Sequence, residues 1–303
     1  MEGFRKHFAN LAVPTRDEDF NYKNEDKIKY EMDIITELTN NLDIKEPTKG
    51  EIYKALESMK KGKASDSFDL TVENFIYAGD NLIDLIHQIL VNIFKKSLIP
   101  DLLKIGLLSP VFTNKGSIVE INNYRVITVL PVFCKIIESI LKLRIRPISI
   151  PLQCTLQRGF TQNSAPLNAS FIVEEVNRKS LDLGQLLIIV LLDAKSAFDV
   201  AVHQNLMRNL YHLGIQYRHW NLIDNLHKHA SSVVKFNGKI SNEFLISQGV
   251  RQGGILSTDL YKIYRDPLLH HLQQSRLGSK IGHIPCCATA CADVVTLNTT
   301  DPK

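Results

Sequence analysis

The chain has 303 residues, of which 44% are hydrophobic and 22% charged, and 36 basic against 32 acidic residues give a formal net charge of +4. This balance is that of an ordinary globular protein and excludes collagen-like, coiled-coil and disordered chains. No run of 18 apolar residues is present, and the charged first thirty residues lack a signal-peptide core, so we expect no membrane span and no secretion. We therefore expect an intracellular protein of the cytoplasm or nucleus whose five cysteines are reduced.

The first half of the chain predicts mixed helix and strand. A helical stretch covers 31–42, and Thr48 followed by Glu51 is a capping box that begins the next helix. Apolar residues at i, i+3 and i+4 spacing predict a helix over 81–97, which ends before Pro100. Two short strands at 106–112 and 122–131 and an amphipathic helix at 132–145 follow.

The second half of the chain is predicted to contain a sheet with a carboxylate at the end of one strand. The unbroken apolar run 186–192 predicts a central strand buried on both faces, and it ends at Asp193. After it we expect helices at 202–213, 218–231 and 258–275, strands at 231–238 and 243–250, and a glycine turn at 253–254. The tail 281–298 is predicted to form two short strands that meet at a tight turn.

Asp193 and Asp293 are carboxylates placed where apolar segments end. A buried ionised carboxylate is costly unless a cation neutralises it, and Mg²⁺ binds through one or two carboxylates together with substrate phosphates. Two such aspartates side by side would suit phosphoryl transfer. A solvent-facing strand end or a structural ion pair is the alternative for each of them.

Three further groups of residues could bind ligands. The segment 249–254, GVRQGG, allows close backbone approach to a ligand, or is a plain turn. Lys115 and Arg125 lie in or beside strand connections, as a phosphate clamp requires, and residues 101–160 carry eight basic and three acidic residues. The C-terminal tail also contains residue types that bind zinc, but they are badly spaced for a zinc site: His283, Cys286, Cys287 and Cys291. We therefore interpret the three cysteines as buried thiols.

Seven blocks of the sequence, in the same order, resemble the reverse transcriptase domain of non-LTR (LINE-type) retrotransposons. They are EIYKALESMKKGKASDSFD (51–69), LIPDLLKIGLLSPVFTNKG (98–116), INNYRVITVLPVFCKIIESIL (121–141), QRGFTQNSAPLNA (157–169), LLDAKSAFDVAVHQNL (191–206), QGVRQGGILSTDLYKIY (248–264) and ATACADVVTL (288–297).

The resemblance implies an α+β fold of the right-hand polymerase type, with fingers and a ferredoxin-like palm sheet with helices, and with the thumb absent. It implies an N-terminal lead-in at 1–48, a fingers-like region at 49–185 and a truncated palm-like region at 186–303. The implied function is an RNA-directed DNA polymerase that adds dNTPs to a primer 3′-OH by two-metal nucleotidyl transfer. Its partners would be an RNA template and a DNA primer, and no membrane.

The resemblance also assigns roles to residues. Asp193 and Asp293 would be the catalytic carboxylates that hold two Mg²⁺ ions, for which Mn²⁺ can substitute. The nucleotide would be bound by Lys115 and Arg125 at the triphosphate, by Phe198 as the gate against a 2′-OH, and by Gln252 and Gly253 along the pocket.

Two positions depart from the family pattern. Val294 stands where the hairpin normally carries its second aspartate, and Val126 stands where a proline is expected. The loss of one carboxylate leaves an alternative function open, a catalytically inactive retrotransposon remnant that keeps the fold and at most binds RNA.

Overall fold

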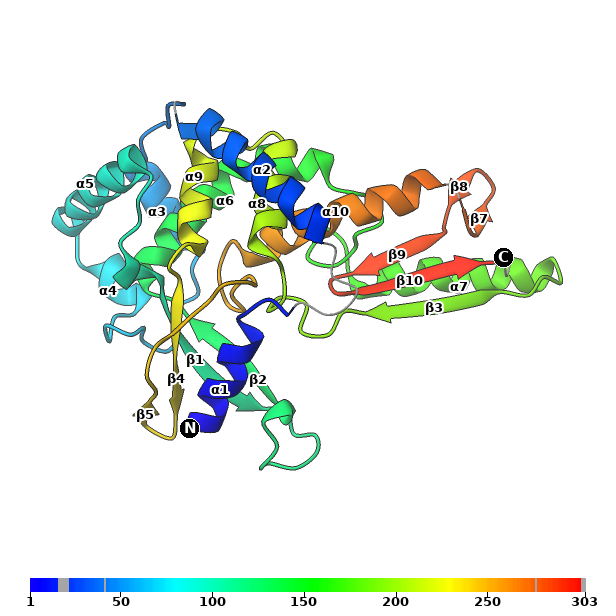
Figure 1. The fold of residues 1–303 in the computed structure, drawn as a ribbon, viewed down its shortest axis with the longest axis horizontal. Helices are drawn as coiled ribbons and strands as arrows, with labels where there is room; N and C mark the ends of the chain where they lie inside the picture. The colour runs from blue at the N-terminus through cyan, green and yellow to red at the C-terminus, as the bar shows by residue number, and fades with distance from the viewer. Residues whose placement is uncertain (16–21, 41, 276, 301–303) are drawn as a thin grey trace. The chain divides into compact units, whose positions relative to one another are not determined.

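The computed structural model describes residues 1–15, 22–40, 42–275 and 277–300, which form two compact units. Unit 1 comprises Met1–Ile148 and Phe198–Ser257, and unit 2 comprises Ser149–Ala197 and Thr258–Lys303. Both contain helices and strands, as Figure 1 shows, so the predicted α+β class is confirmed. The subdomain boundaries implied at residues 48 and 185 remain a prediction.

The helices of unit 1 follow the apolar periodicity of the sequence. They are α1 (Glu2–Leu11), α2 (Tyr22–Asn40), α3 (Lys49–Ser58), α4 (Val72–Tyr77), α5 (Asp80–Lys96), the first part of α6 (Val132–Leu152), α8 (His203–His212) and α9 (Arg218–His227), with short 3₁₀ turns at Asp101–Lys104 and Ile121–Asn123. The capping box of α3 is confirmed, because Thr48 Oγ1 accepts from the Glu51 amide at 3.2 Å while Glu51 Oε2 accepts from the Thr48 amide at 2.8 Å. Trp220 is completely buried on α9 and donates its indole N–H to the Met207 carbonyl at 2.7 Å. No helix in the described ranges is long and apolar enough to cross a membrane.

The sheet of unit 1 is built around a hairpin. Its strands are β1 (Ile105–Phe112), β2 (Tyr124–Val129), β4 (Ser231–Phe236), β5 (Lys239–Ile240) and β6 (Phe244–Leu245), in the order β2-β1-β4-β5 with β6 also paired to β4. β1 and β2 are antiparallel, and β1 and β4 are parallel. Phe4 and Phe8 of helix α1, and Ala12 directly after it, close this core by packing with Leu108 and Val234.

The strand predicted at 243–250 is much shorter in the structure. Only Phe244–Leu245 pair as a strand, and the chain after them leaves the sheet. The reason is that the following amides bind elsewhere, since Gly249 N–H donates to the Ala201 carbonyl at 2.7 Å.

Unit 2 contains a three-stranded antiparallel sheet in the order β3-β10-β9. Its elements are the end of α6, α7 (Pro166–Asp182), β3 (Ile188–Asp193), α10 (Ser257–Ser275), β7 (Lys280–Ile281), β8 (Ile284–Pro285), β9 (Ala288–Cys291) and β10 (Val294–Thr299). The predicted hairpin in the tail is confirmed as β9 and β10. Apolar residues of the sheet pack with α10 and with the segment after α6: Cys154, Leu156, Leu269, Cys287, Ala288, Ala290 and Val295.

The prediction that 186–192 forms a central strand buried on both faces is wrong. β3 is at the edge of the described sheet and pairs with β10, and its apolar side chains are largely exposed, with Leu191 at 68%. An unbroken apolar run indicates burial in general, but the run alone does not say which element would cover it. In the described part of the chain no second strand pairs with β3.

Candidate functional site

The two predicted carboxylates lie beside each other at one end of the unit 2 sheet. Asp193 is the last residue of β3, and Asp293 lies in the turn that joins β9 to β10. The antiparallel register pairs Asp193 with Val294, and the Ala194 amide lies 3.4 Å from the Asp293 carbonyl. Asp193 is exposed and Asp293 is partly exposed. The juxtaposition expected from the two strand ends is therefore present in one unit.

The turn that carries Asp293 is hydrogen-bonded to Gln157, a residue to which the sequence analysis assigned no role. Gln157 is 2% exposed, and its Oε1 accepts from the Ala292 amide at 3.1 Å and from the Gly159 amide at 2.8 Å. Arg265 donates to the Ala292 carbonyl at 2.9 Å. Ala292 has a φ of +57°, which is uncommon for a non-glycine residue, so these bonds stabilise an unusual backbone conformation.

Gly159 fits against this turn because it has no side chain. A Cβ at this position would overlap the Ala292 amide nitrogen and lie 2.8 Å from the Ala292 Cα. The block QRGF, with Gly159 two residues after the buried Gln157, is the only local trace of this contact in the sequence. Ala292, against which Gly159 packs, is more than 130 residues away. Gln157 and Gly159 therefore position the hairpin from a distance that a local pattern does not reveal.

The residues at this sheet end are of the type that binds Mg²⁺, but they supply two carboxylates where the family pattern has three. Two carboxylates together with phosphate oxygens form the oxygen donor set that Mg²⁺ takes in enzymes acting on phosphates. In an antiparallel pair, directly opposite residues share one face of the sheet, so Val294 occupies the position where a third carboxylate would face Asp193. No group of three or more His, Cys, Asp or Glu side chains able to hold a metal occurs among the described residues.

Three of the predicted nucleotide-binding residues come together in unit 1. The Val250 amide donates to the Phe198 carbonyl at 2.7 Å, and the Thr128 amide on β2 donates to the Gln252 carbonyl at 2.8 Å. Gly253 has a φ of +108°, and a Cβ there would lie 2.5 Å from the Thr128 carbonyl oxygen. The close approach of this backbone to β2 therefore explains why a glycine occupies position 253.

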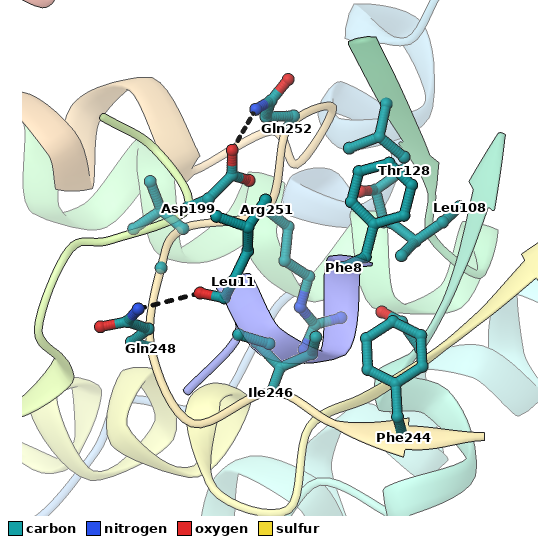
Figure 2. A pocket seen from close by; sticks show the side chains of 15 residues that line it. Phe8, Leu11, Leu108, Thr128, Asp199, Phe244, Ile246, Gln248, Arg251 and Gln252 are labelled. Carbon is teal, nitrogen blue, oxygen red and sulfur yellow. Dashed lines mark hydrogen bonds between the residues drawn. The ribbon is translucent and has the colours of Figure 1, made fainter. Parts of the chain in front are cut away.

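The side chain of Gln252 is fixed by an aspartate that sequence reasoning did not single out. Gln252 Nε2 donates to Asp199 Oδ2 at 2.9 Å, as Figure 2 shows. Both line a cavity of about 50 Å³, room for one or two waters and too small for a nucleotide. Another wall is formed by Gln248, whose amide donates to the Leu11 carbonyl at 2.9 Å (Figure 2). Burial raises the pKa of Asp199 to about 6, an effect that the hydrogen bond from Gln252 partly offsets.

We expect Asp199→Asn to stabilise unit 1 at neutral pH and not in acid. Because the folded-state pKa is raised, the native state binds more protons than the unfolded state between about pH 4 and 6, and stability falls as pH rises through this window. The variant escapes this loss, so its free energy of unfolding should exceed that of the parent by up to about 3 kcal/mol above pH 7 and match it near pH 4. Urea unfolding followed by Trp220 fluorescence measures this.

The control for this prediction is Glu57→Gln, which removes an exposed carboxylate from α3 in the same unit. The difference in free energy of unfolding between Glu57→Gln and the parent should not change between about pH 4 and 6, the range in which Asp199 titrates. A constant difference between Asp199→Asn and the parent from pH 4 to 8 would contradict the assignment.

Lys115 and Arg125 both belong to the β1–β2 hairpin of unit 1. Arg125 lies on β2 opposite Val111, and Lys115 lies in the connection that follows β1. Both are exposed. The structure therefore places both cations on one β-hairpin. That they bind a triphosphate stays a prediction.

Two of the three cysteines of the C-terminal tail are buried in unit 2 as predicted, whereas Cys291 is partly exposed. Cys286 and Cys287 are buried, and the Cys287 thiol lies 3.6 Å from the Leu272 carbonyl oxygen. Burial raises the pKa of the Cys286 thiol, which disfavours the thiolate form that metals bind. His283 is exposed on the β7–β8 turn.

Comparison with known proteins gives the family. Residues 113–288 match the model of the family described as reverse transcriptase (RNA-dependent DNA polymerase). The chain is 27% identical over 233 residues to the Transposon TX1 uncharacterized 149 kDa protein of Xenopus laevis, covering 76% of this chain and 18% of that protein. It is 30% identical over 141 residues to the retrovirus-related Pol polyprotein from type-2 retrotransposable element R2DM of Drosophila melanogaster, covering 46% and 13%.

The chain is also similar to a third transposon protein and to a solved structure. The Pol polyprotein from type-1 retrotransposable element R2 of Popillia japonica is 26% identical over 184 residues, covering 60% of this chain and 26% of that protein. A solved structure of apo telomerase from Candida tropicalis, truncated from its C-terminal domain, aligns with a TM-score of 0.45 and 14% identity, covering 68% of this chain and 45% of that one. The chain thus spans between 13% and 26% of the length of these transposon relatives.

Proposed function

The chain belongs to the reverse transcriptase (RNA-dependent DNA polymerase) family as a domain of the non-LTR retrotransposon type, and we propose that it is the polymerase domain that copies an RNA template into DNA. The observation that carries the proposal is the register of the unit 2 sheet, which pairs Asp193 with the residue next to Asp293. Asp193 at the end of β3 and Asp293 on the β9–β10 hairpin, whose turn is bonded to Gln157, would together form an anionic centre at one end of the sheet.

In this proposal the chain extends a primer by one nucleotide at a time. The primer 3′-oxygen bonds to the α-phosphorus of a dNTP, the bond to the pyrophosphate oxygen breaks and releases pyrophosphate, and the 3′-OH proton passes to solvent water. Asp193 and Asp293 would hold Mg²⁺ or Mn²⁺, which when bound supplies charge stabilisation at the attacking and leaving oxygens.

The residues of unit 1 would bind the nucleotide. Lys115 and Arg125 would neutralise the triphosphate, which needs cations because its negative charge would otherwise oppose attack. Phe198 would exclude a 2′-OH by its bulk. Gln252, oriented by Asp199, and Gly253 would contact the nucleotide from outside the cavity of about 50 Å³, which is too small to hold it.

Val294 favours a second candidate function, an inactive remnant that retains the fold and binds RNA. A valine opposite Asp193 leaves two carboxylates where the family pattern has three, so less negative charge is available to retain two divalent ions. RNA binding by basic surfaces would persist without metal, because it depends on phosphate contacts.

Primer extension on an RNA template separates the two functions. We expect the chain to add dNTPs to an annealed DNA primer with Mn²⁺ or Mg²⁺, and we expect Asp193→Asn to reduce the rate by at least about 100-fold. The measurement is product length on a denaturing gel, with EDTA and template omission as controls. Extension that is unaffected by Asp193→Asn would refute the assigned site, and no extension by the chain together with intact RNA binding would favour the remnant.

A further inference from the structure

The backbone turn at 248–252, which carries Gln252, is bonded to an imidazole to which the proposed function gives no role. His203 is the first residue of α8, and its Nε2 donates to the Gly249 carbonyl at 2.8 Å. We propose that His203 is a positioning residue that fixes this turn and thereby maintains the selection of dNTPs over rNTPs by Phe198. The inference rests on the proposed function, because Phe198 and Gln252 bind a nucleotide only in that function.

The bonding of the turn to the chain between Phe198 and His203 is the first argument. The Gly249 amide donates to the Ala201 carbonyl at 2.7 Å, and the Val250 amide donates to the Phe198 carbonyl at 2.7 Å. His203 binds the carbonyl of the same Gly249, so both polar groups of this glycine have partners in that segment. A shift of the Gly249 peptide would therefore be transmitted to the backbone of Phe198.

The backbone conformation of Gly249 is the second argument. Its φ is +89°, and a Cβ there would lie 2.6 Å from the Asp199 carbonyl oxygen and 2.9 Å from that of Phe198. Only a glycine permits so close an approach, and glycine also has the most freely moving backbone of any residue. A hydrogen bond to the Gly249 carbonyl therefore restrains the turn at the point where the backbone is least restricted by its own side chain.

The protonation state of His203 is the third argument. A carbonyl oxygen only accepts, so His203 Nε2 carries a proton, and so does His227 Nδ1, which donates to the Ile223 carbonyl at 2.7 Å. Burial lowers the pKa of both imidazoles, so each is neutral at neutral pH and keeps this single N–H. The two ring centroids lie 4.6 Å apart, so His227 packs against His203 from the end of α9.

Two other side chains of the turn are bonded at different points. Arg251 donates to the Leu226 carbonyl at 2.8 Å, and Gln252 donates to Asp199 at 2.9 Å. Neither bond involves the Gly249 carbonyl, which is the group that His203 restrains. The position of the turn relative to Phe198 therefore depends on His203 in addition to these two bonds.

Two variants at position 203 separate the hydrogen bond from the rest of the side chain. The amide nitrogen of glutamine can take the place of Nε2, whereas the shorter asparagine places its amide nitrogen near Nδ1, out of reach of the carbonyl. In single-nucleotide primer extension, His203→Asn should raise the KM for dATP by about 10-fold with a smaller change in kcat. It should also lower the selectivity for dATP over ATP, as the ratio of kcat/KM values, by about 10-fold. His203→Gln should retain both the KM and the selectivity.

The matched structural control is Leu206→Ala, because Leu206 is completely buried on the same helix. It should lower the melting temperature of the chain without changing the selectivity. Unchanged selectivity in His203→Asn would overturn the proposal. An equal loss of selectivity in Leu206→Ala or in His203→Gln would also overturn it, because the effect would then not come from the hydrogen bond.

Hydrogen exchange of peptides covering 247–253 tests the positioning of the turn without catalysis. His203→Asn should accelerate exchange there by about 10-fold or more, and His203→Gln should not. Unchanged exchange in His203→Asn would overturn the positioning role, whatever the activity of the chain. If the chain extends no primer and only His203→Asn accelerates exchange, the proposed function fails while the positioning of the turn by His203 is supported.

Discussion

Replacing Val294 by aspartate is expected to raise the rate of primer extension by about 100- to 1,000-fold. The register pairs residue 294 with Asp193, so a carboxylate there would share the sheet face of Asp193 and add a third oxygen ligand. Val294 is only half-buried, and the added charge would not be forced into the core. A transition-state contact of this kind is worth about 3 to 4 kcal/mol, which sets the expected range. The measurement is single-nucleotide incorporation with Mn²⁺ and Mg²⁺.

Two further variants define the cause of that gain. Val294→Asn has nearly the shape of aspartate without its charge, and it should leave the rate near that of the parent. Asp193→Asn in the Val294→Asp background should remove the gain, because the new carboxylate acts together with Asp193. In EDTA the added aspartate should lower the melting temperature of the protein by charge repulsion, and Mn²⁺ should restore it. If Val294→Asp changes neither the rate nor the metal response, the assigned metal site is refuted.

The features that the sequence predicted well are those set by neighbouring residues. Thr48 and Glu51 are three residues apart, and the capping bonds that this spacing predicts are present in α3. The apolar spacing at 81–97 is sufficient for α5 because a helix face is defined within a few turns. Asp193 and Asp293 are predicted to lie side by side because each ends an apolar segment, and the structure pairs β3 with the β9–β10 hairpin in one sheet. Their role as metal ligands stays a prediction.

The features that the sequence did not predict depend on contacts between distant segments. Gln157 supports Ala292 across 135 positions, and no local pattern of apolar residues encodes such a bond. The exposure of Leu191 on β3 depends on which strands pair, whereas an apolar run has the same appearance in edge and central strands. His203 and His227 come into contact only after α8 and α9 have folded into unit 1.

Replacing Gly159 by alanine is expected to loosen the β9–β10 hairpin while leaving unit 1 intact. The new Cβ would overlap the Ala292 amide nitrogen, and the backbone of the turn would have to move, because no flexible side chain lies there to give way. Overpacking against backbone costs about 3 kcal/mol or more, and the hydrogen bond from the Ala292 amide to Gln157 should break. Hydrogen exchange of peptides covering 288–299 should therefore accelerate by about 100-fold. Trp220, the one tryptophan, reports unit 1, and its unfolding transition should not shift.

The control is Gly50→Ala on α3, where the new Cβ would lie 3.9 Å from Thr48 Oγ1, an ordinary contact. Alanine there should raise the stability of unit 1 by up to about 1 kcal/mol through helix propensity, without any effect on exchange in 288–299. Unchanged exchange in the hairpin of Gly159→Ala would mean that the turn tolerates the methyl group and that Gln157 and Gly159 do not position Asp293. Faster exchange that coincides with loss of the Mn²⁺ response in the Val294→Asp background would show that the carboxylates depend on this support. The catalytic geometry of the hairpin would then be set by a segment that touches neither metal nor substrate.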